Sequence, residues 1–316
     1  MDGKIKMCNR GFHACESPFD VFDYYTMIDS RFCEVEQDGN ISKEDRGTKI
    51  CSSKIKIKAE LKLADMINLG VEWLKEITSP EKIKTSIKDN SSGNNAQIGS
   101  SGDGAKIGSS GYDAKIGSSG DGAQIGSSGY DAKIGSSGYG AKIGSSGHDA
   151  QIGSSGNNVQ IGSSGYGAQI GSSGYDAQIG SSGNNVQIGS SGNNAKIGSS
   201  GDGAKIGSSG YDAQIGSSGD GAQIGSSGYG AKISSSGYGA KIDSTGEDCV
   251  IMCAGINSVA KASKGSWVTL SEWSYSEEKQ RYIPICVKTE FVDGEKIKAD
   301  TYYSLKGGVF VEWIND

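Results

Sequence analysis

Residues 96–104 read Ala-Gln-Ile-Gly-Ser-Ser-Gly-Asp-Gly, and close variants of this nine-residue unit follow one another 17 times, up to residue 248. The first position is Ala in every unit except for Val159 and Val186, and the third position is always Ile. A short repeat with a fixed period indicates a stacked architecture in which each unit contacts mainly its neighbours. The repeat therefore predicts a solenoid in the middle of the chain.

Side chains within a unit alternate between two faces of an extended strand. Positions 1, 3 and 5 (Ala, Ile, Ser) point one way, whereas positions 2, 4 and 6 (Lys or Gln, Gly, Ser) point the other way. We expect the Ile side chains to form a buried ladder and the Lys and Gln side chains to form ladders that face solvent. The core ladder includes Ile98, Ile107, Ile116, Ile125, Ile134, Ile143 and Ile170.

Each unit closes with Gly and two residues drawn mostly from Asn, Asp, Gly and Tyr, which indicates a turn. Nine residues are too few to close a coil around a filled interior, so we expect two units, or 18 residues, to form one rung with two strands. About nine rungs result if residues 249–257 count as a degenerate unit. The predicted fold class is mainly β: a central β-solenoid or β-roll, an N-terminal α+β cap and a small C-terminal antiparallel β domain.

Two other interpretations of the repeat, a flexible linker and a calcium-binding roll, compete with the solenoid. Gly- and Ser-rich sequence is also typical of flexible linkers, but a linker does not require Ile at every ninth residue. Calcium-binding rolls require Asp at a fixed place in each turn, whereas turns such as 157–158 and 166–167 contain none. We therefore expect an ordered solenoid without regular calcium sites, and the metal and cofactor prediction for the chain is none.

The flanking segments are predicted to be separate domains. Residues 1–90 read as an α+β module that caps the first rung, 91–257 as the solenoid, and 258–316 as a small β domain. In the first module, 31–37 and 48–62 have the pattern of strands. A helix is expected to begin at Ser17-Pro18, with Ser17 as its N-cap and with one aromatic face: Phe19, Phe22 and Tyr25.

A second helix is predicted over 63–77, because apolar residues recur there with helical spacing. Its inward residues are Met66, Ile67, Val71 and Leu74. The C-terminal segment alternates as strands and has hairpin turns at 293–294 and 307–308. The expected core of that domain is Trp267, Trp273, Tyr302 and Trp313.

Charge and cysteine content favour a soluble, cytoplasmic protein. The 316 residues carry a net charge of −6, and the repeat itself contains 8 Lys and 12 acidic residues. No segment is basic enough to indicate nucleic-acid binding, and none is long and apolar enough to span a membrane. The seven cysteines are an odd number without a disulfide spacing, and no signal peptide is visible at the N-terminus.

The end motifs resemble an uncharacterised group of nonapeptide-repeat proteins from phages, prophages and Firmicute bacteria. The similar stretches are Gly11-Phe-His-Ala-Cys-Glu-Ser-Pro-Phe-Asp-Val-Phe-Asp-Tyr-Tyr25 and 292–303. The repeat departs from the group's version, which is richer in Thr and Asn. The resemblance implies a phage-linked origin, and thus the cytoplasm of a host cell, but it implies no activity and no catalytic residues.

His13 is the one candidate catalytic residue. Cys8, His13, Cys15 and Cys33 could supply zinc ligands, but they lack the close Cys-x-x-Cys pair that is usual in zinc sites. The Gly11-Phe-His string also resembles ADP-ribosyltransferase-like folds, in which a strand His holds the dinucleotide. The other marks of that family are absent, so a structural role for His13 is the alternative.

Aromatic residues in the turns are candidates for partner binding. With 18 residues per rung, Tyr112, Tyr130, His148 and Tyr166 fall on one edge of successive rungs. The other edge carries, less regularly, Tyr139, Tyr175, Tyr211 and Tyr229. Stacked exposed rings can bind a partner, or they can simply stabilise the turns.

These observations give three functional hypotheses. The leading hypothesis is a non-enzymatic, phage-associated interaction protein that presents its end domains and turn residues to a host or phage protein, as a counter-defence inhibitor. The second is a DNA mimic, although a net charge of −4 over the repeat is dilute for that role. The third is an enzyme seated in the N-terminal module that uses His13.

Overall fold

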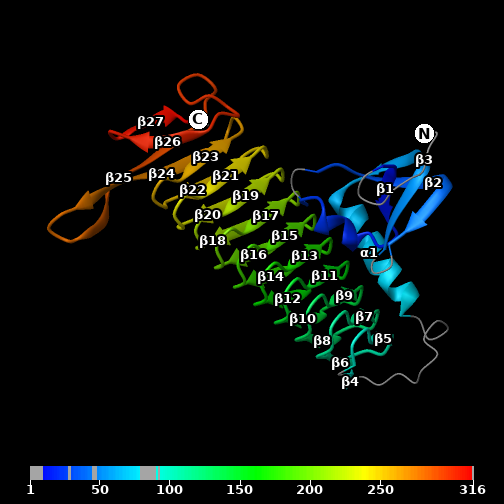
Figure 1. Ribbon diagram of the computed structural model, residues 1–316. Helices are drawn as coiled ribbons and strands as arrows, with labels where there is room; N and C mark the ends of the chain where they lie inside the picture. The colour runs from blue at the N-terminus through cyan, green and yellow to red at the C-terminus, as the bar shows by residue number, and fades with distance from the viewer. Residues whose placement is uncertain (1–9, 28–29, 45–47, 79–89, 92, 315–316) are drawn as a thin grey trace.

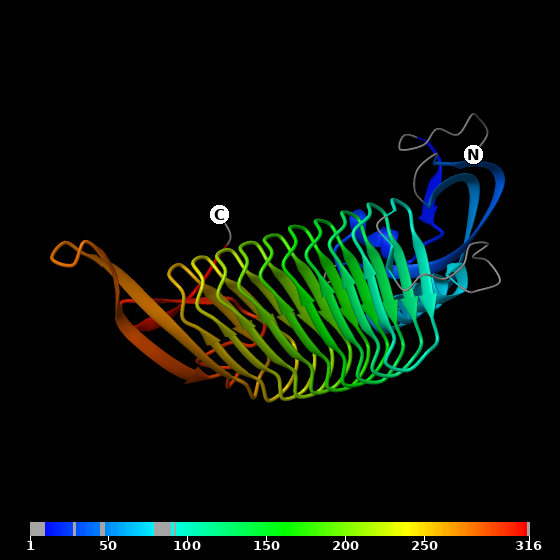
Figure 2. The same cartoon turned by 90° about the horizontal axis from the view of Figure 1, so that it is seen from below.

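The structure is a computed structural model that describes residues 10–27, 30–44, 48–78, 90–91 and 93–314. Stacked strands form a rod, an N-terminal module lies along one flank near one end, and further strands continue the other end (Figure 1). The view in Figure 2 shows the regular coils of the rod and the C-terminal hairpin that extends beyond them.

The rod consists of two sheets, which we call sheet A and sheet B. Successive units alternate between them, so each rung contributes one strand to each sheet. Sheet A contains β4 (Asn90–Ser91), β6 (Lys106–Ser109), β8 (Gln124–Ser127), β10 (Lys142–Ser145), β12 (Gln160–Ser163), β14 (Gln178–Ser181), β16 (Lys196–Ser199), β18 (Gln214–Ser217), β20 (Lys232–Ser235), β22 (Val250–Cys253), β24 (Trp267–Ser276) and β25 (Arg281–Phe291).

Sheet B has the same construction from the intervening units. It contains β5 (Gln97–Ser100), β7 (Lys115–Ser118), β9 (Lys133–Ser136), β11 (Gln151–Ser154), β13 (Gln169–Ser172), β15 (Gln187–Ser190), β17 (Lys205–Ser208), β19 (Gln223–Ser226), β21 (Lys241–Ser244), β23 (Val259–Ala262), β26 (Tyr303–Lys306) and β27 (Val309–Glu312). The repeat strands pair in parallel and in register, each residue with the one 18 positions later, as Ile161 does with Ile179. The predicted solenoid with two units per rung is confirmed.

Alternation places the isoleucines inside. The repeat Ile residues are only 0–4% exposed, and the Ala or Val of position 1 packs beside them. Ser at position 5 is also buried in most units. The interior is therefore a thin stack of small side chains, whose stability depends on ladder hydrogen bonds and contact between neighbouring rungs.

Two positions of each turn explain why the unit tolerates so little change. The last residue of the unit has a positive φ, as in Asp149 (53°) and Gly167 (70°), which restricts it to Gly, Asn or Asp. The Gly at position 7 lies against the backbone of the previous rung: a Cβ at Gly165 would be 1.8 Å from the carbonyl oxygen of Gly147. Turn geometry therefore restricts two of the nine positions to a few residue types.

The N-terminal module combines a three-stranded antiparallel sheet with two helices. Helix α1 covers Leu63–Ile77, as predicted, and its expected inward residues are buried. The prediction of a helix capped by Ser17 is wrong: the segment forms a single 3-10 turn with Pro18 at its N-cap, and Tyr25 is exposed. The other elements are β1 (Phe12–Cys15), η1 (Phe19–Asp23), β2 (Phe32–Lys43) and β3 (Lys49–Leu61), in the sheet order β1-β3-β2.

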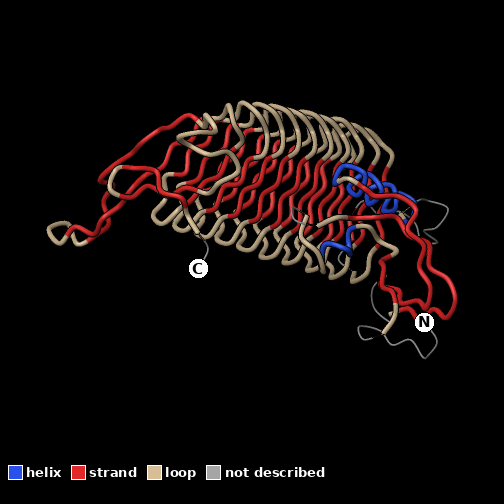
Figure 3. The backbone as a smooth tube through the Cα atoms, turned by 90° about the horizontal axis from the view of Figure 1, so that it is seen from above, coloured by secondary structure: helices blue, strands red, loops and turns tan. Residues whose placement is uncertain are grey.

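The described part of the module lies along the side of the rod, and the residues between α1 and the first rung lie outside the described residues. Helix α1 runs across β7, β9, β11, β13 and β15 of sheet B. Figure 1 and Figure 3 both show the helix alongside these strands. The described part of the module therefore covers the outer face of sheet B from β7 to β15.

The C-terminal segment contains the antiparallel strands that the sequence predicted, and these strands continue the two sheets of the rod. Strand β24 pairs in parallel with β22, and β26 pairs with β23, so both sheets grow to about 10 turns in all. Of the expected core residues, Trp267 is 49% exposed, whereas Trp273, Tyr302 and Trp313 are only partly buried. The buried residues here are Val268, Leu270, Val292, Ile297, Tyr303 and Leu305, which belong to the same core as the isoleucines.

Candidate protein-binding surfaces

The outer face of sheet B carries a column of glycines, at position 4 of the unit, that the N-terminal module covers. A Cβ at Gly153 would lie 2.1 Å from Cζ of Phe19. A Cβ at Gly171 would lie 2.8 Å from Cγ1 of Ile67. The absence of side chains in this column leaves a groove, and the module fills it. Other side chains that meet the column are Leu63, Leu74 and Thr78.

Helix α1 fits this groove because its pitch is close to the strand spacing. Residues four or seven positions apart meet the glycines of successive strands: Leu63 at β15, Ile67 at β13, Leu74 at β9 and Thr78 at β7. One α-helical turn rises about 5.4 Å, and neighbouring strands lie about 4.8 Å apart. One turn of helix therefore crosses about one strand, so one apolar ridge of the helix meets the glycines of β15, β13, β9 and β7, while Phe19 of η1 meets Gly153 of β11.

Two aspartates of η1 contact the row of Lys and Gln side chains, at position 2 of the unit, that lies beside the groove of sheet B. Lys133 forms an ion pair with Asp20, and both side chains are largely buried. Asp23 Oδ1 accepts hydrogen bonds from Nε2 of Gln151 (3.0 Å) and of Gln169 (3.1 Å). Carboxylates of the module thus pair with Lys133 and with the Nε2 groups of Gln151 and Gln169 in this row.

This arrangement corrects the expectation that every Lys and Gln side chain faces solvent. Gln151 and Gln169 are buried, because the module covers them. Burial, and secondarily the neighbouring Asp20, raises the pKa of Asp23. The exchange Gln169→Glu, harmless on an open face, would here set a second carboxylate against Asp23.

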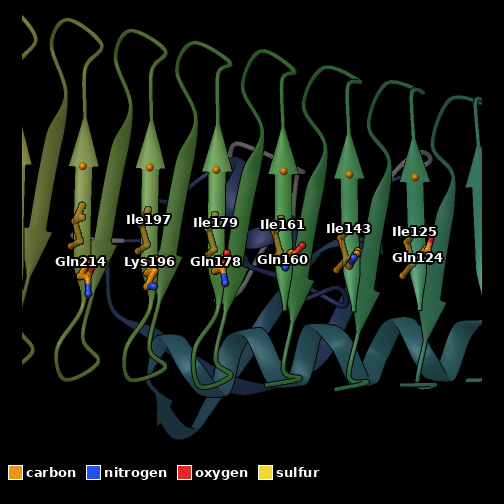
Figure 4. A pocket seen from close by; sticks show the side chains of 18 of the residues that line it. Gln124, Ile125, Ile143, Gln160, Ile161, Gln178, Ile179, Lys196, Ile197 and Gln214 are labelled. Carbon is orange, nitrogen blue, oxygen red and sulfur yellow. The ribbon is translucent and has the colours of Figure 1, made fainter. Parts of the chain in front are cut away.

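Sheet A carries the same glycine column, and the described part of the chain leaves it open. A Cβ placed on its central glycines would meet no atom within 4 Å. An exposed groove runs along the column from β6 to β22, lined by positions 2, 3 and 4 of each unit. In Figure 4, Gln124, Gln160, Gln178, Lys196 and Gln214 form one row across successive strands of this face. The open glycines are Gly126, Gly144, Gly162, Gly180 and Gly198.

Four lysines flank this groove: Lys106, Lys142, Lys196 and Lys232. Among the described residues, none of the four forms an ion pair with a carboxylate. In sheet B, by contrast, Lys133 pairs with Asp20 as described above. Within the described part of the chain, the lysines of this row on sheet A therefore have no carboxylate partner.

The groove leads to an apolar patch at the C-terminal end of sheet A. Val250 and Met252 line the last part of the groove, and both are about half exposed. Val250 is the register partner of Trp267, which in turn pairs with Phe291, and these two rings lie 5.1 Å apart. An exposed cluster of large apolar side chains is typical of interaction sites.

The turn aromatics on one edge of the rod, which we call the aromatic edge, stack in the predicted order. Ring centroids of Tyr112 and Tyr130 lie 5.2 Å apart, those of Tyr130 and His148 4.9 Å, and those of His148 and Tyr166 6.2 Å. The stack ends there because Asn184 takes the next turn. On the other edge, Tyr139 and Tyr175 are exposed without such a stack, and only the pair Tyr211 and Tyr229 meets, at 6.4 Å.

His13 and the nearby cysteines do not form a metal site within the described residues. His13 is half-buried on β1, opposite Cys51 of β3. Burial, with a smaller contribution from Asp20, raises the pKa of the Cys15 thiol to about 11, so this thiol is neutral at pH 7. Cys8 lies outside the described residues. No described group of three His, Cys, Asp or Glu side chains could hold a metal ion.

Comparison with known proteins gives one match. Residues 1–69 match a family described as a domain of unknown function, DUF7666, which covers the three-stranded sheet, η1 and the first half of α1. No curated protein and no solved structure matches the chain. Within the described residues, no helix has the length and apolarity needed to cross a membrane.

Sequence reasoning missed the groove of sheet A, although its signal was visible. Gly is a poor strand former, and a Gly inside a strand often marks a place where another chain approaches closely. Position 4 is Gly in every unit of the repeat except for Ser234 and Asp243. The outward glycines of the strands were therefore the positions to single out, in addition to the turn aromatics.

Proposed function

We propose that this protein is a non-enzymatic scaffold that binds a protein partner along the open groove of sheet A. The proposal rests on a difference between the outer faces of sheet A and sheet B, which are built from the same repeat unit. The glycine groove of sheet B is filled by the protein's own module, whereas the groove of sheet A ends in an exposed apolar patch and has no described occupant. Large exposed apolar surfaces beside polar rows are typical of binding faces.

The resemblance of the end motifs to phage-linked proteins suggests the setting. In this proposal the protein acts in the cytoplasm of a host cell, where it occupies a surface of a host protein and blocks it as a counter-defence inhibitor. The rod keeps the groove straight and rigid, which lowers the entropy that is lost on binding. The aromatic edge of Tyr112, Tyr130, His148 and Tyr166 is a second candidate contact.

The same face argues against the DNA-mimic alternative. A mimic needs a dense anionic surface, because phosphate charge dominates such recognition. The long face of sheet A carries lysines and glutamines at position 2 and no carboxylate among its groove-lining residues in the described chain. Host enzymes that bind DNA would therefore meet a weakly basic face.

Affinity capture with matched variants tests the proposal. The full chain, a groove-filled variant (Gly144→Val, Gly162→Val, Gly180→Val) and an edge variant (Tyr112→Ser, Tyr130→Ser, Tyr166→Ser) are used as bait in lysate of the cells that carry the gene. The three glycines have open space at Cβ, so the valines are expected to be tolerated. We expect a stoichiometric protein partner on the wild-type chain and the edge variant, and its loss from the groove-filled variant.

Two results would contradict the proposal. A partner that binds all three baits equally, or that is lost only from the edge variant, would show that the groove of sheet A is not the contact. Circular dichroism and thermal unfolding of the three baits ensure that loss of binding is not loss of fold.

A further inference from the structure

We infer that the groove of sheet A receives an amphipathic α-helix with acidic residues along one flank, supplied by the partner. This inference rests on the proposed function and specifies the occupant of the same groove. The protein already contains one amphipathic helix seated in such a groove, α1 on sheet B, with the carboxylates of η1 beside it.

The same residue types line the two grooves. Both are built from strands with the pattern Lys/Gln-Ile-Gly-Ser, stacked in register. Since α1 crosses about one strand per turn in sheet B, a helix with apolar residues at intervals of four and seven fits sheet A by the same match of pitch and strand spacing. The groove from β6 to β22 crosses nine strands, which is roughly 38 Å or about 25 helical residues.

The lysines of the sheet A groove favour a bound helix with acidic residues on the flank that faces them. In sheet B, Asp20 and Asp23 hold the Lys and Gln row, whereas the four groove lysines of sheet A have no described ion-pair partner. A helix that carries Glu or Asp toward this row would supply the missing carboxylates. At the far end, the patch around Trp267 and Phe291 would receive a large apolar residue of the same helix.

Charge also argues against a second copy of this chain as the occupant. Sheet A packed face to face on sheet A would bring two lysine rows together, and like charges that are desolvated in an interface are unfavourable. The chain's own α1 is seated on sheet B, so it does not supply the helix. A helix from another protein satisfies both requirements.

A synthetic peptide provides the test. The peptide has the sequence of residues 62–78 with Met66→Glu, Trp73→Glu and Ile77→Glu, three positions on the flank where Trp73 of α1 approaches Lys115 of the Lys/Gln row. A covalent staple joins positions 72 and 76, which are exposed in α1 and point away from the groove. Two control peptides carry Lys in place of the three Glu residues, or Ile67→Asp on the apolar ridge.

Binding to the full-length chain is measured by fluorescence anisotropy at low and at physiological salt. We expect saturable binding of the acidic peptide that is at least tenfold tighter than that of either control and weakens with salt. We expect it to fall at least tenfold with the groove-filled variant, and with Lys142→Glu plus Lys196→Glu. Sedimentation of the chain alone should give a monomer.

Three outcomes would overturn the inference: no binding of the acidic peptide, equal binding of the acidic and lysine peptides, or a dimer that the groove-filled variant converts to a monomer. The proposed function has its own readout. If the cellular partner still depends on the sheet A groove while the acidic peptide fails to bind, the groove is a binding site for something other than this kind of helix.

Discussion

Ile170→Asp is expected to unfold the middle of the rod. Ile170 lies in β13 at 0% exposure, stacked between Ile152 and Ile188 in a core that contains no charge to pair with an introduced carboxylate. Placing an unpaired charge in such a site falls in the class of substitutions that cost about 4 kcal/mol or more. Because each rung is stabilised by its neighbours, the damage should spread to the rungs on both sides.

Hydrogen–deuterium exchange with mass spectrometry measures this effect along the chain. Peptides from β11, β13 and β15 should lose protection, whereas the C-terminal end of the rod should change least. Gln160→Asp on the exposed face of sheet A is the matched control, and its effect should stay within about 1 kcal/mol, as for most surface substitutions. Full protection around residue 170 in the variant would contradict the assignment of the isoleucines to a dry core.

Gly153→Ala should destabilise the protein, whereas Gly162→Ala should not. The two glycines occupy the same position of the repeat, in sheet B and sheet A respectively, and neither has a positive φ. The added methyl group at 153 would lie 2.1 Å from Phe19, and overpacking of this kind typically costs about 1–3 kcal/mol. At 162 the methyl group enters open space, and replacing Gly by Ala at a compatible site typically stabilises by about 0.4–1 kcal/mol.

Thermal unfolding followed by Trp fluorescence compares the two variants. Trp73 lies on α1 next to Lys115 of sheet B, so its emission reports release of the module in a background where Trp267, Trp273 and Trp313 are replaced by Phe. We expect a lower transition temperature and earlier exposure of Trp73 for Gly153→Ala, and an unchanged or higher transition temperature for Gly162→Ala. Equal effects at the two sites would mean that the module does not rest on the glycine column of sheet B.

Much of the architecture could be predicted from local patterns. The 18-residue rung, the buried isoleucines and the limits of α1 follow from side-chain periodicity, which is a property of short segments. The stack from Tyr112 to Tyr166 follows as well, because a fixed period determines which turn residues share an edge.

The relation between the module and the rod could not be predicted in this way. The apolar side of α1 shows that the helix must be buried, but units of sheet A and sheet B share one sequence, so nothing in the repeat distinguishes the face that Ile67 contacts. Burial of Gln169 follows from tertiary packing that the repeat does not encode. Likewise, the alternation around Trp267 predicts a strand, but which of its faces is buried depends on the rung that β24 continues.

Two faces built from the same repeat unit differ in what covers them, and thiol labelling tests this difference most directly. Gln160→Cys and Gln169→Cys place a thiol at the same position of the unit in sheet A and in sheet B, each in a Cys33→Ser background that removes an exposed native thiol. Labelling by a maleimide is followed by intact mass. We predict rapid labelling of the Gln160→Cys variant and strong protection of the Gln169→Cys variant until the protein unfolds. Equal labelling rates in the folded protein would contradict the claim.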